Sequence, residues 1–311
     1  MRYIEDFREG ENVVGHYLCR TKDTLKTKAG KPYLSLKLLD KTGTIDAKVW
    51  DVHKDIHAFE EGDFIKIDAL ASLYQNDMQL KVSRIRKSLE GEYMKADYIP
   101  AGTKDIDEVY EELLGYIKTI DSRFVKTLLE NVFVENVEIK KAFKEHSAAK
   151  AMHHAYMGGL AEHTLSVVQI ADFMSGRYKF VNRDVLVSCA MLHDLCKIYE
   201  LSEFPENDYT DDGNLIGHIV MGAELVEREA TKIEGFPEKL KTLMKHCILS
   251  HHGEYEFGSP KKPMIIEAFL LSCCDNTDAK VRMYEEALEK SKTQWTGWNR
   301  MLDRNIRNSE F

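Results

Sequence analysis

The sequence predicts an α+β protein of more than one domain, in which a small β-barrel precedes an all-α helical bundle. Through the first 90 residues, apolar residues alternate with a period of two, as in half-buried strands. From about residue 105 onward they recur every three or four residues, as in amphipathic helices. Between these regions, residues 91–104 follow neither period and contain Pro100 and Gly102. The 311 residues are enough for two domains.

The expected boundaries follow these changes of period. Residues 1–90 form the barrel domain, 91–104 a linker, 105–300 the helical domain and 301–311 a C-terminal tail. The net charge of −9 excludes a wholly basic nucleic-acid binder. No apolar run approaches the roughly 20 residues of a membrane-spanning helix, and no signal peptide is evident. The six cysteines form no CxxC pair. We therefore expect a cytoplasmic protein with reduced thiols and no membrane partner.

Five short strands are expected in the first domain. The alternation is clearest in Tyr33–Leu39, where three leucines share one face and Tyr33, Ser35 and Lys37 share the other. The remaining expected strands are Val13–Cys19, Thr44–Trp50, Phe64–Leu70 and Gln79–Ile85, with turns at 40–43 and 75–77 and a helical stretch at 52–59. This set fits a small barrel of the OB type.

A basic cluster occupies the expected connection between the first two strands and continues into the second. Residues 20–37 contain a single acid, Asp23, and six basic residues. In OB-folds this connection and the neighbouring strands bind single-stranded nucleic acids. The residues expected to make such contacts are Lys22, Lys26, Lys28, Lys31, Tyr33 and Lys37. Tyr33, Trp50 and Tyr74 are candidate stacking surfaces, although a place in the barrel core is the first expectation for Trp50. A solvated basic loop is the alternative interpretation.

The helical region contains an unusual apolar run, Val185–Glu200. It carries His193-Asp194, with Lys197 three residues further on. Burial of an unpaired carboxylate is costly unless a cation or hydrogen bonds compensate it. For this dipeptide alone, a capping Asp beside a core histidine is the alternative interpretation. The helices expected from the period are 106–120, 122–134, 137–146, 160–174, 184–198, 217–231, 237–251 and 264–288.

Further potential metal ligands recur within apolar helical sequence. Nine of the twelve histidines fall between residues 146 and 252. Each buried polar group would need its own hydrogen-bond partner, whereas one cation or a pair would satisfy several together. Imidazole and carboxylate ligands suit Mn²⁺, Fe²⁺ or Zn²⁺, and two bridged ions fit phosphoester hydrolysis. The candidate ligands are His163, His193, Asp194, His218, His251, His252 and Asp275.

The order of these residues resembles that of the HD-domain metal-dependent phosphohydrolase superfamily. The positions that match its first metal site are His163, His193, Asp194 and Asp275. The resemblance implies that Asp194 bridges to a second metal, which His218 and His251 complete, with His252 as the alternative to His251. It also implies that Asp194 and Lys197 are the catalytic residues, with Lys197 contacting a substrate phosphate. A lysine that faces the dipole at a helix C-terminus is the alternative for Lys197.

Four further segments narrow the resemblance. A basic OB-type barrel ahead of an HD domain, with GGLAEHTLS at 158–166, SHHGE at 250–254, FGSP at 257–260 and DNTDAK at 275–280, resembles the YhaM family of bacterial 3′→5′ exoribonucleases over nearly the whole chain. The resemblance implies a two-metal enzyme that uses Mn²⁺, with Fe²⁺, Zn²⁺, Mg²⁺ and Co²⁺ as alternatives. Its substrate would be single-stranded RNA, and single-stranded DNA stays open as a second substrate.

Three expectations concern residues near the ligands. Asp278 either orients a ligand or caps its helix. His153 and His154 are candidates for the entrance to the site or for phosphate contact. Glu162 is expected to face the solvent.

Two other functions stay open on the sequence alone. One is an HD-domain phosphohydrolase of nucleotides or cyclic dinucleotides with the barrel as a regulator. The other is a non-catalytic OB-fold nucleic-acid-binding protein with a structural metal. No GYP motif follows His251-His252, which disfavours cyclic dinucleotides. A second metal position is rare in structural sites. A homo-oligomer also stays open.

Overall fold

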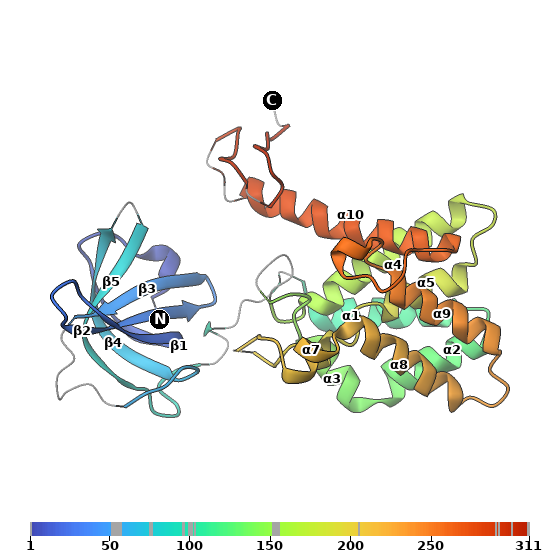
Figure 1. Cartoon of the computed structure of the whole chain (residues 1–311), viewed down its shortest axis with the longest axis horizontal. Coiled ribbons are helices and arrows are strands. Elements are labelled where there is room, and N and C mark those ends of the chain that lie inside the picture. Colours follow the sequence, from blue (N-terminus) through green and yellow to red (C-terminus); the bar gives the residue numbers. More distant parts are fainter. Residues whose placement is uncertain are drawn as a thin grey trace. The chain divides into compact units, whose positions relative to one another are not determined.

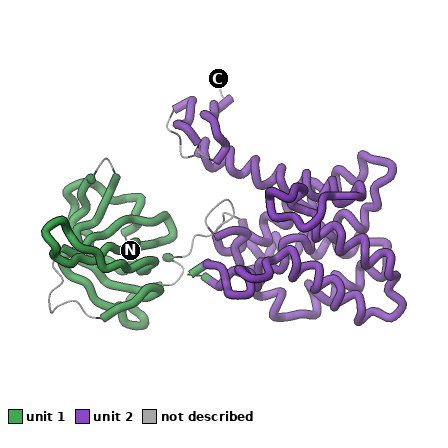
Figure 2. Tube along the Cα trace, in the orientation of Figure 1, with its two compact units in different colours: residues 1–101, 204–206 green, residues 102–203, 207–311 purple. Residues whose placement is uncertain are grey.

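The computed structural model describes residues 2–50, 58–74, 77–94, 97–98, 102, 104–150, 156–204, 206–289, 291, 293–299 and 301–309. The chain divides into two compact units (Figure 2). We call residues 1–101 and 204–206 the β unit, and residues 102–203 and 207–311 the helical unit. Among the described helices, none is both long enough and apolar enough to span a membrane.

The β unit is a closed five-stranded barrel with the strand order β1-β2-β3-β5-β4 (Figure 1). Its strands are β1 (Asn12–Lys26), β2 (Pro32–Asp40), β3 (Gly43–Val49), β4 (Phe64–Tyr74) and β5 (Asp77–Lys87), with a short helix η1 (Ile4–Asp6) ahead of them. β3 and β5 run parallel, and the other neighbouring strands run antiparallel. Leu34, Leu36 and Leu38 are buried in the barrel interior, as their alternation predicts.

The first strand is longer than the sequence indicates. β1 continues to Lys26 and pairs with β2 as far as Pro32, so much of the expected connection is strand. A tight turn closes this hairpin, with Gly30 in the left-handed region at φ 80°. The strand extends because backbone pairing does not require apolar side chains, and the polar residues here face solvent. The expected helix at 52–59 and turn at 75–77 lie largely outside the described residues.

The helical unit is an all-α bundle, in agreement with the predicted fold class. Its elements are α1 (Ile106–Lys118), α2 (Arg123–Glu130), η3 (Asn131–Glu135), α3 (Val137–Glu145), α4 (Gly159–Arg177), α5 (Arg183–Leu192), α6 (Lys197–Glu200), α7 (Asp211–Leu215), α8 (His218–Thr231), α9 (Glu238–Ser250), η4 (Tyr255–Phe257) and α10 (Ile266–Glu289). Every residue of α5 from Val185 to Leu192 is buried, as expected for a helix that is apolar on all sides. α5 packs against α4, α9 and α10 and forms the centre of the core.

The expected helix at 184–198 is interrupted. α5 ends at Leu192, residues 193–196 form turns, and α6 begins at Lys197. The backbone N–H groups of Leu195, Lys197 and Ile198 each donate to a carbonyl three residues earlier, which tightens the chain relative to an α-helix. The His193 ring also hydrogen-bonds the Ala190 carbonyl at 2.8 Å. The His-Asp pair therefore lies at a break between two helices.

Candidate metal centre and nucleic-acid interface

Helix ends and one helix interior bring the predicted ligands together. His163 lies near the start of α4, His218 begins α8, and Asp275 lies within α10. The pairs at 193–194 and 251–252 directly follow α5 and α9. His163, His193, Asp194, His218 and His251 are buried, whereas His252 and Asp275 are partly accessible. The structure thus gathers all seven predicted ligands in one site.

Asp194 lies between two groups of side chains. Its Oδ2 is 3.4 Å from His163 Nε2 and 3.5 Å from His193 Nε2. Its Oδ1 is 3.3 Å from His218 Nε2 and 3.6 Å from His251 Nε2. Each carboxylate oxygen therefore faces a different pair of imidazoles, as a bridging ligand requires.

The first group, which we call site A, consists of His163, His193 and Asp275. Their potential ligand atoms all lie within 4.8 Å of one another. His163 Nε2 is 3.3 Å from His193 Nε2 and 3.3 Å from Asp275 Oδ1. With Asp194 Oδ2, two imidazole nitrogens and two carboxylate oxygens converge on a common point.

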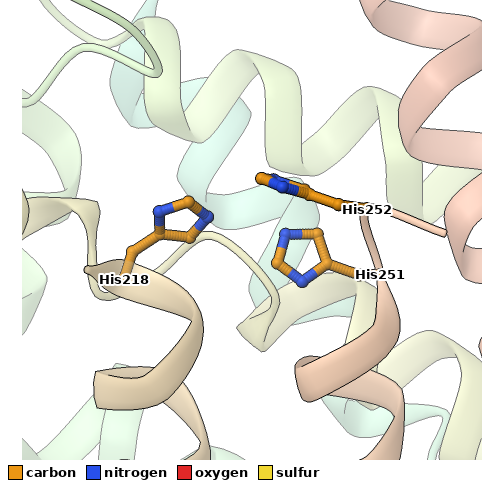
Figure 3. A group of neighbouring side chains, drawn as sticks. All are labelled: His218, His251 and His252. Atoms are coloured by element: carbon orange, nitrogen blue, oxygen red, sulfur yellow. The ribbon is translucent and has the colours of Figure 1, made fainter. Parts of the chain in front are cut away.

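The second group, which we call site B, consists of His218, His251 and His252 (Figure 3). Their potential ligand atoms also lie within 4.8 Å of one another. His251 and His252 are adjacent, with ring centroids 4.4 Å apart. The sequence alone does not decide whether His251 or His252 is a metal ligand. In the structure both rings reach the site.

All five imidazoles have an oxygen atom beside Nδ1. His193, His251 and His252 contact the carbonyl oxygens of Ala190, Ile248 and Phe257 at 2.7–2.8 Å. A carbonyl oxygen only accepts, so each of these Nδ1 atoms carries the hydrogen. The lone pair of the neutral ring is then on Nε2, the atom that faces the site. This is the arrangement in which histidine ligates a metal.

Carboxylates orient the other two imidazoles. His163 Nδ1 lies 2.7 Å from Asp278 Oδ2, and His218 Nδ1 lies 2.9 Å from Glu200 Oε1. The His218 backbone N–H also donates to Glu200 Oε1, at 3.0 Å. Of the two readings of Asp278, the geometry therefore favours ligand orientation. Glu200 was missed by sequence reasoning, because nothing local links this acid to a histidine 18 residues further along the chain.

Orphaned polar atoms test whether this set fits a cation. Asp194 Oδ1, His218 Nε2 and His251 Nε2 are buried and have no hydrogen-bond partner among the described residues. Burial of such atoms without a partner costs about 1–3 kcal/mol each. All three belong to site B or to Asp194, and a divalent cation would satisfy them together. The donor set therefore fits a metal.

The protonation preferences also suit cation binding. Burial opposes the charge on Asp194, but Lys197 and the surrounding histidines hold its pKa well below the usual range. Burial lowers the pKa of His193 to about 4. Burial likewise disfavours a charged His163, yet hydrogen bonds with Asp194, Asp275 and Asp278 raise its pKa well above the usual value. These shifts favour an ionised Asp194 and positive charge beside it, which a cation would also supply.

Lys197 lies against the Asp194 carboxylate. Its Nζ donates to Asp194 Oδ2 at 2.7 Å and to the Ala148 carbonyl at 2.8 Å. An ammonium group has three N–H donors, so these two contacts leave one for a phosphate oxygen. Lys197 also lines a 190 Å³ cavity together with Asp194 and Asp275. A lysine that only faces the dipole at a helix C-terminus would not explain these contacts, because the side chain of Lys197 faces the site.

Two other expectations have different outcomes. Glu162 does not face the solvent as expected, since it is buried and accepts a hydrogen bond from the Tyr156 hydroxyl at 3.0 Å. Its position on the helix beside His163 turns it inward because α4 is buried on most sides of its first turns. His153 and His154 lie outside the described residues.

The predicted nucleic-acid residues are spread along the β1–β2 hairpin. Lys26, Lys28, Lys31 and Lys37 are exposed. Lys22 differs from them because its Nζ donates to the Phe59 carbonyl and lies 3.4 Å from Glu60 Oε2. These contacts tie Lys22 to the barrel itself, so it is a weaker candidate for phosphate contact.

Trp50 corrects the expectation of a core residue. Its side chain is 43% exposed, and its ring stacks on that of Tyr33 with centroids 4.7 Å apart. Val49 points into the barrel, so the alternation of the strand turns Trp50 outward. Trp50 and Tyr33 together present a stacked aromatic surface beside Lys48, which hydrogen-bonds Ser35 at 2.6 Å.

Comparisons with known proteins agree with both units. Residues 160–280 match the HD domain family, and residues 20–87 match the OB-fold nucleic acid binding domain family. Three curated relatives carry the name 3′-5′ exoribonuclease YhaM. The protein from Geobacillus sp. is 33% identical over 93% of this chain and 89% of its own length. Those from Shouchella clausii and Halalkalibacterium halodurans are 33% and 31% identical, over 92% and 93% of this chain and 89% and 90% of their own lengths.

Proposed function

Since the chain belongs to the YhaM 3′-5′ exoribonuclease family, we infer that it is a metal-dependent exoribonuclease, and we propose that it acts on single-stranded RNA with two Mn²⁺ ions. Single-stranded DNA is a proposed second substrate. The products would be nucleoside monophosphates released from the 3′ end.

One observation carries the two-metal proposal. The oxygens of Asp194 face separate pairs of histidines. We assign His163, His193, Asp194 and Asp275 to the first ion, and Asp194, His218, His251 and His252 to the second. Mn²⁺ is favoured because both sites combine carboxylate and imidazole without thiolate, and Fe²⁺, Zn²⁺, Mg²⁺ and Co²⁺ are the alternatives.

The residues around the metal sites would have separate roles in hydrolysis. When bound, two divalent cations supply charge neutralisation at the phosphoryl oxygens and a lowered pKa for the attacking water. Asp194 fixes the spacing of the two sites, and Asp278 and Glu200 hold the rings of His163 and His218. Lys197 keeps Asp194 ionised and offers its remaining N–H to the scissile phosphate.

The β unit would bind the strand upstream of the cleaved bond. Exposed lysines of the β1–β2 hairpin suit phosphates, and the Tyr33–Trp50 pair suits bases. We propose residues 1–90 as the RNA-binding domain, 105–300 as the catalytic domain, 91–104 as the linker and 301–311 as a tail. The cytoplasm is the proposed location, because all six cysteines are free thiols.

End-labelled single strands test the proposal. With Mn²⁺, a 5′-labelled RNA should shorten stepwise, and a 3′-labelled RNA should release labelled mononucleotide at once. Asp194→Asn removes the bridging charge and should lower turnover on the order of 10³-fold, because several kcal/mol of metal catalysis are lost. Intact RNA in the presence of Mn²⁺, or hydrolysis of free nucleotides and cyclic dinucleotides alone, would contradict the proposal.

A further inference from the structure

Two larger cavities flank the metal centre within the helical unit. A cavity of 540 Å³ lies on one side and a groove of 810 Å³ on the other, and both are lined by His252 and Phe257. The smaller cavity also reaches His218 and Lys197, whereas the groove reaches His251 and Asp275. A strand bound across the two sites would therefore have space on each side of its scissile phosphate.

The 540 Å³ cavity combines a charged end with apolar walls. Lys197 and His218 stand at the metal centre, while Tyr209, Ile216 and Phe257 form walls further away. These three side chains are 47%, 47% and 63% exposed, so their apolar surface is available to a ligand. A nucleotide has a matching distribution of charge, with a charged phosphate at one end and a flat base at the other.

The chain around Tyr209 is held by several hydrogen bonds. Residue Asn207 has a left-handed backbone at φ 43° and is 5% exposed. Its amide donates to the carbonyls of Ala149 and Lys150 at 3.1 Å, and its Oδ1 accepts from Ser147 at 2.6 Å. The backbone of Tyr209 forms a bridge with Leu201. Such over-determined contacts around a strained residue are typical of functional sites.

Phe257 is linked to the metal centre through His252. The His252 Nδ1–H donates to the Phe257 carbonyl at 2.8 Å. The backbone at Phe257 is thereby tied to a proposed metal ligand. An exposed aromatic ring beside a catalytic centre gives a base a surface on which to stack.

The groove on the other side has a different chemistry. Phe269, Asn276 and Lys280 line it along α10, and spacings of seven and four residues place them on one helix face. Lys262 lines the same groove and pairs with Glu254. Polar and cationic groups along an extended groove suit a sugar-phosphate backbone.

We propose that the 540 Å³ cavity binds the sugar and base of the 3′-terminal nucleotide, with Tyr209 and Phe257 as its stacking surfaces, and that the α10 groove holds the preceding nucleotides. This inference rests on the proposed function and names the subsites that would make the enzyme remove one nucleotide at a time. Stacking tolerates every base, so the cavity accepts any terminal nucleotide.

Substrates with and without a terminal base test this assignment. The full chain with Mn²⁺ is assayed on a single-stranded RNA and on the same RNA with an abasic 3′-terminal nucleotide. The wild type should cleave the abasic end more slowly, by about 5- to 150-fold in kcat/KM. Tyr209→Ala should slow the normal RNA and reduce this ratio toward one, with unchanged Mn²⁺ content. Affinity for AMP in an equilibrium titration should fall by a similar factor.

Phe269→Ala is the matched control on the other side of the centre. It should weaken binding of long RNA while the abasic ratio and the affinity for AMP stay at wild-type values. The assignment is overturned if the wild type does not distinguish the two ends, if Tyr209→Ala keeps the full ratio, or if Phe269→Ala removes it. A wild type that cleaves no RNA refutes the proposed function instead, and the AMP titration still reports on the cavity.

Discussion

The chemistry of the centre begins with one carboxylate. Asp194 is ionised although it is buried, because Lys197 lies 2.7 Å away and imidazoles surround it. Its two oxygens face site A and site B separately. The orientation of each histidine is set by an oxygen on the far side of the ring, so the site is organised before a cation binds.

Glu200 and Asp278 give a selective prediction, because each carboxylate orients one ligand of a different site. Glu200→Gln should weaken the binding of one Mn²⁺ ion about 10- to 100-fold and leave the other nearly unchanged. Asp278→Asn should affect the opposite ion by a similar factor. A two-step Mn²⁺ titration followed by electron paramagnetic resonance would measure both affinities.

The control for this experiment is Glu224→Gln, which changes an exposed acid on α8. It should leave both affinities unaltered. If Glu200→Gln and Asp278→Asn weaken the same ion, or weaken both ions equally, the separation into two sites is wrong.

The sequence indicated which residues gather at the site but not which groups hold them in place. His163, His193, Asp194, His218 and Asp275 stand out because they are polar in apolar helices. Glu200 ends the apolar run that begins at Val185, and in the sequence it looks like any surface acid. Glu200 contacts His218 because the chain turns back between these two residues. The local pattern of apolar residues does not predict that turn.

The helices serve the site mainly through their ends. α5 and α9 stop just before their histidines, and α8 starts at one. The predicted helix at 184–198 was too long because its apolar pattern continues through Leu195 and Ile198. The apolar pattern indicates which residues are buried, but it does not show that the His193 ring hydrogen-bonds the Ala190 carbonyl. Helix existence was therefore predictable, whereas this functional break was not.

Gly213 in α7 packs closely against the backbone of Glu200 in α6. A Cβ on this residue of α7 would lie 2.9 Å from the carbonyl carbon of Glu200. Gly213→Ala should therefore move α7 away from α6, reduce the free energy of unfolding by about 1–3 kcal/mol, and weaken Mn²⁺ binding through Glu200. Thermal unfolding with and without Mn²⁺ would measure both effects.

Gly115→Ala in α1 is the matched control, since a Cβ there would meet no atom within 4 Å. Removing a helical glycine should raise the free energy of unfolding by about 0.5–1 kcal/mol. Equal stability of the Gly213→Ala variant and the wild type would show that the α6–α7 contact does not constrain Glu200.

The whole molecule joins a barrel with exposed lysines to an acidic helical unit. Its fold class was predictable, because the period of the apolar residues changes once along the chain. The extent of the β1–β2 hairpin and the outward position of Trp50 were not, because strand pairing and register depend on residues distant in sequence.

The exposed lysines of the β1–β2 hairpin are expected to make the binding of a long strand depend on salt. Replacing Lys26, Lys28 and Lys31 with alanine removes three potential phosphate contacts. The slope of log affinity against log salt for a long single strand should fall by about 2. Hydrolysis of a dinucleotide, which offers too few phosphates for the barrel, should be unaffected. Filter binding across a salt series and a dinucleotide assay would measure the two effects.

The control for this triple variant replaces three exposed lysines of the helical unit, Lys118, Lys179 and Lys239. That variant should keep the wild-type salt slope. An unchanged slope in the hairpin variant, or an equal fall in the control, would place strand binding elsewhere.

The most direct test of the central claim is the anomalous diffraction of crystals of the Mn²⁺-loaded protein. Two manganese peaks are expected, one bound to Asp194 Oδ2 with His163, His193 and Asp275, and the other bound to Asp194 Oδ1 with His218, His251 and His252. A single peak, or a second peak that Asp194 does not touch, would contradict it.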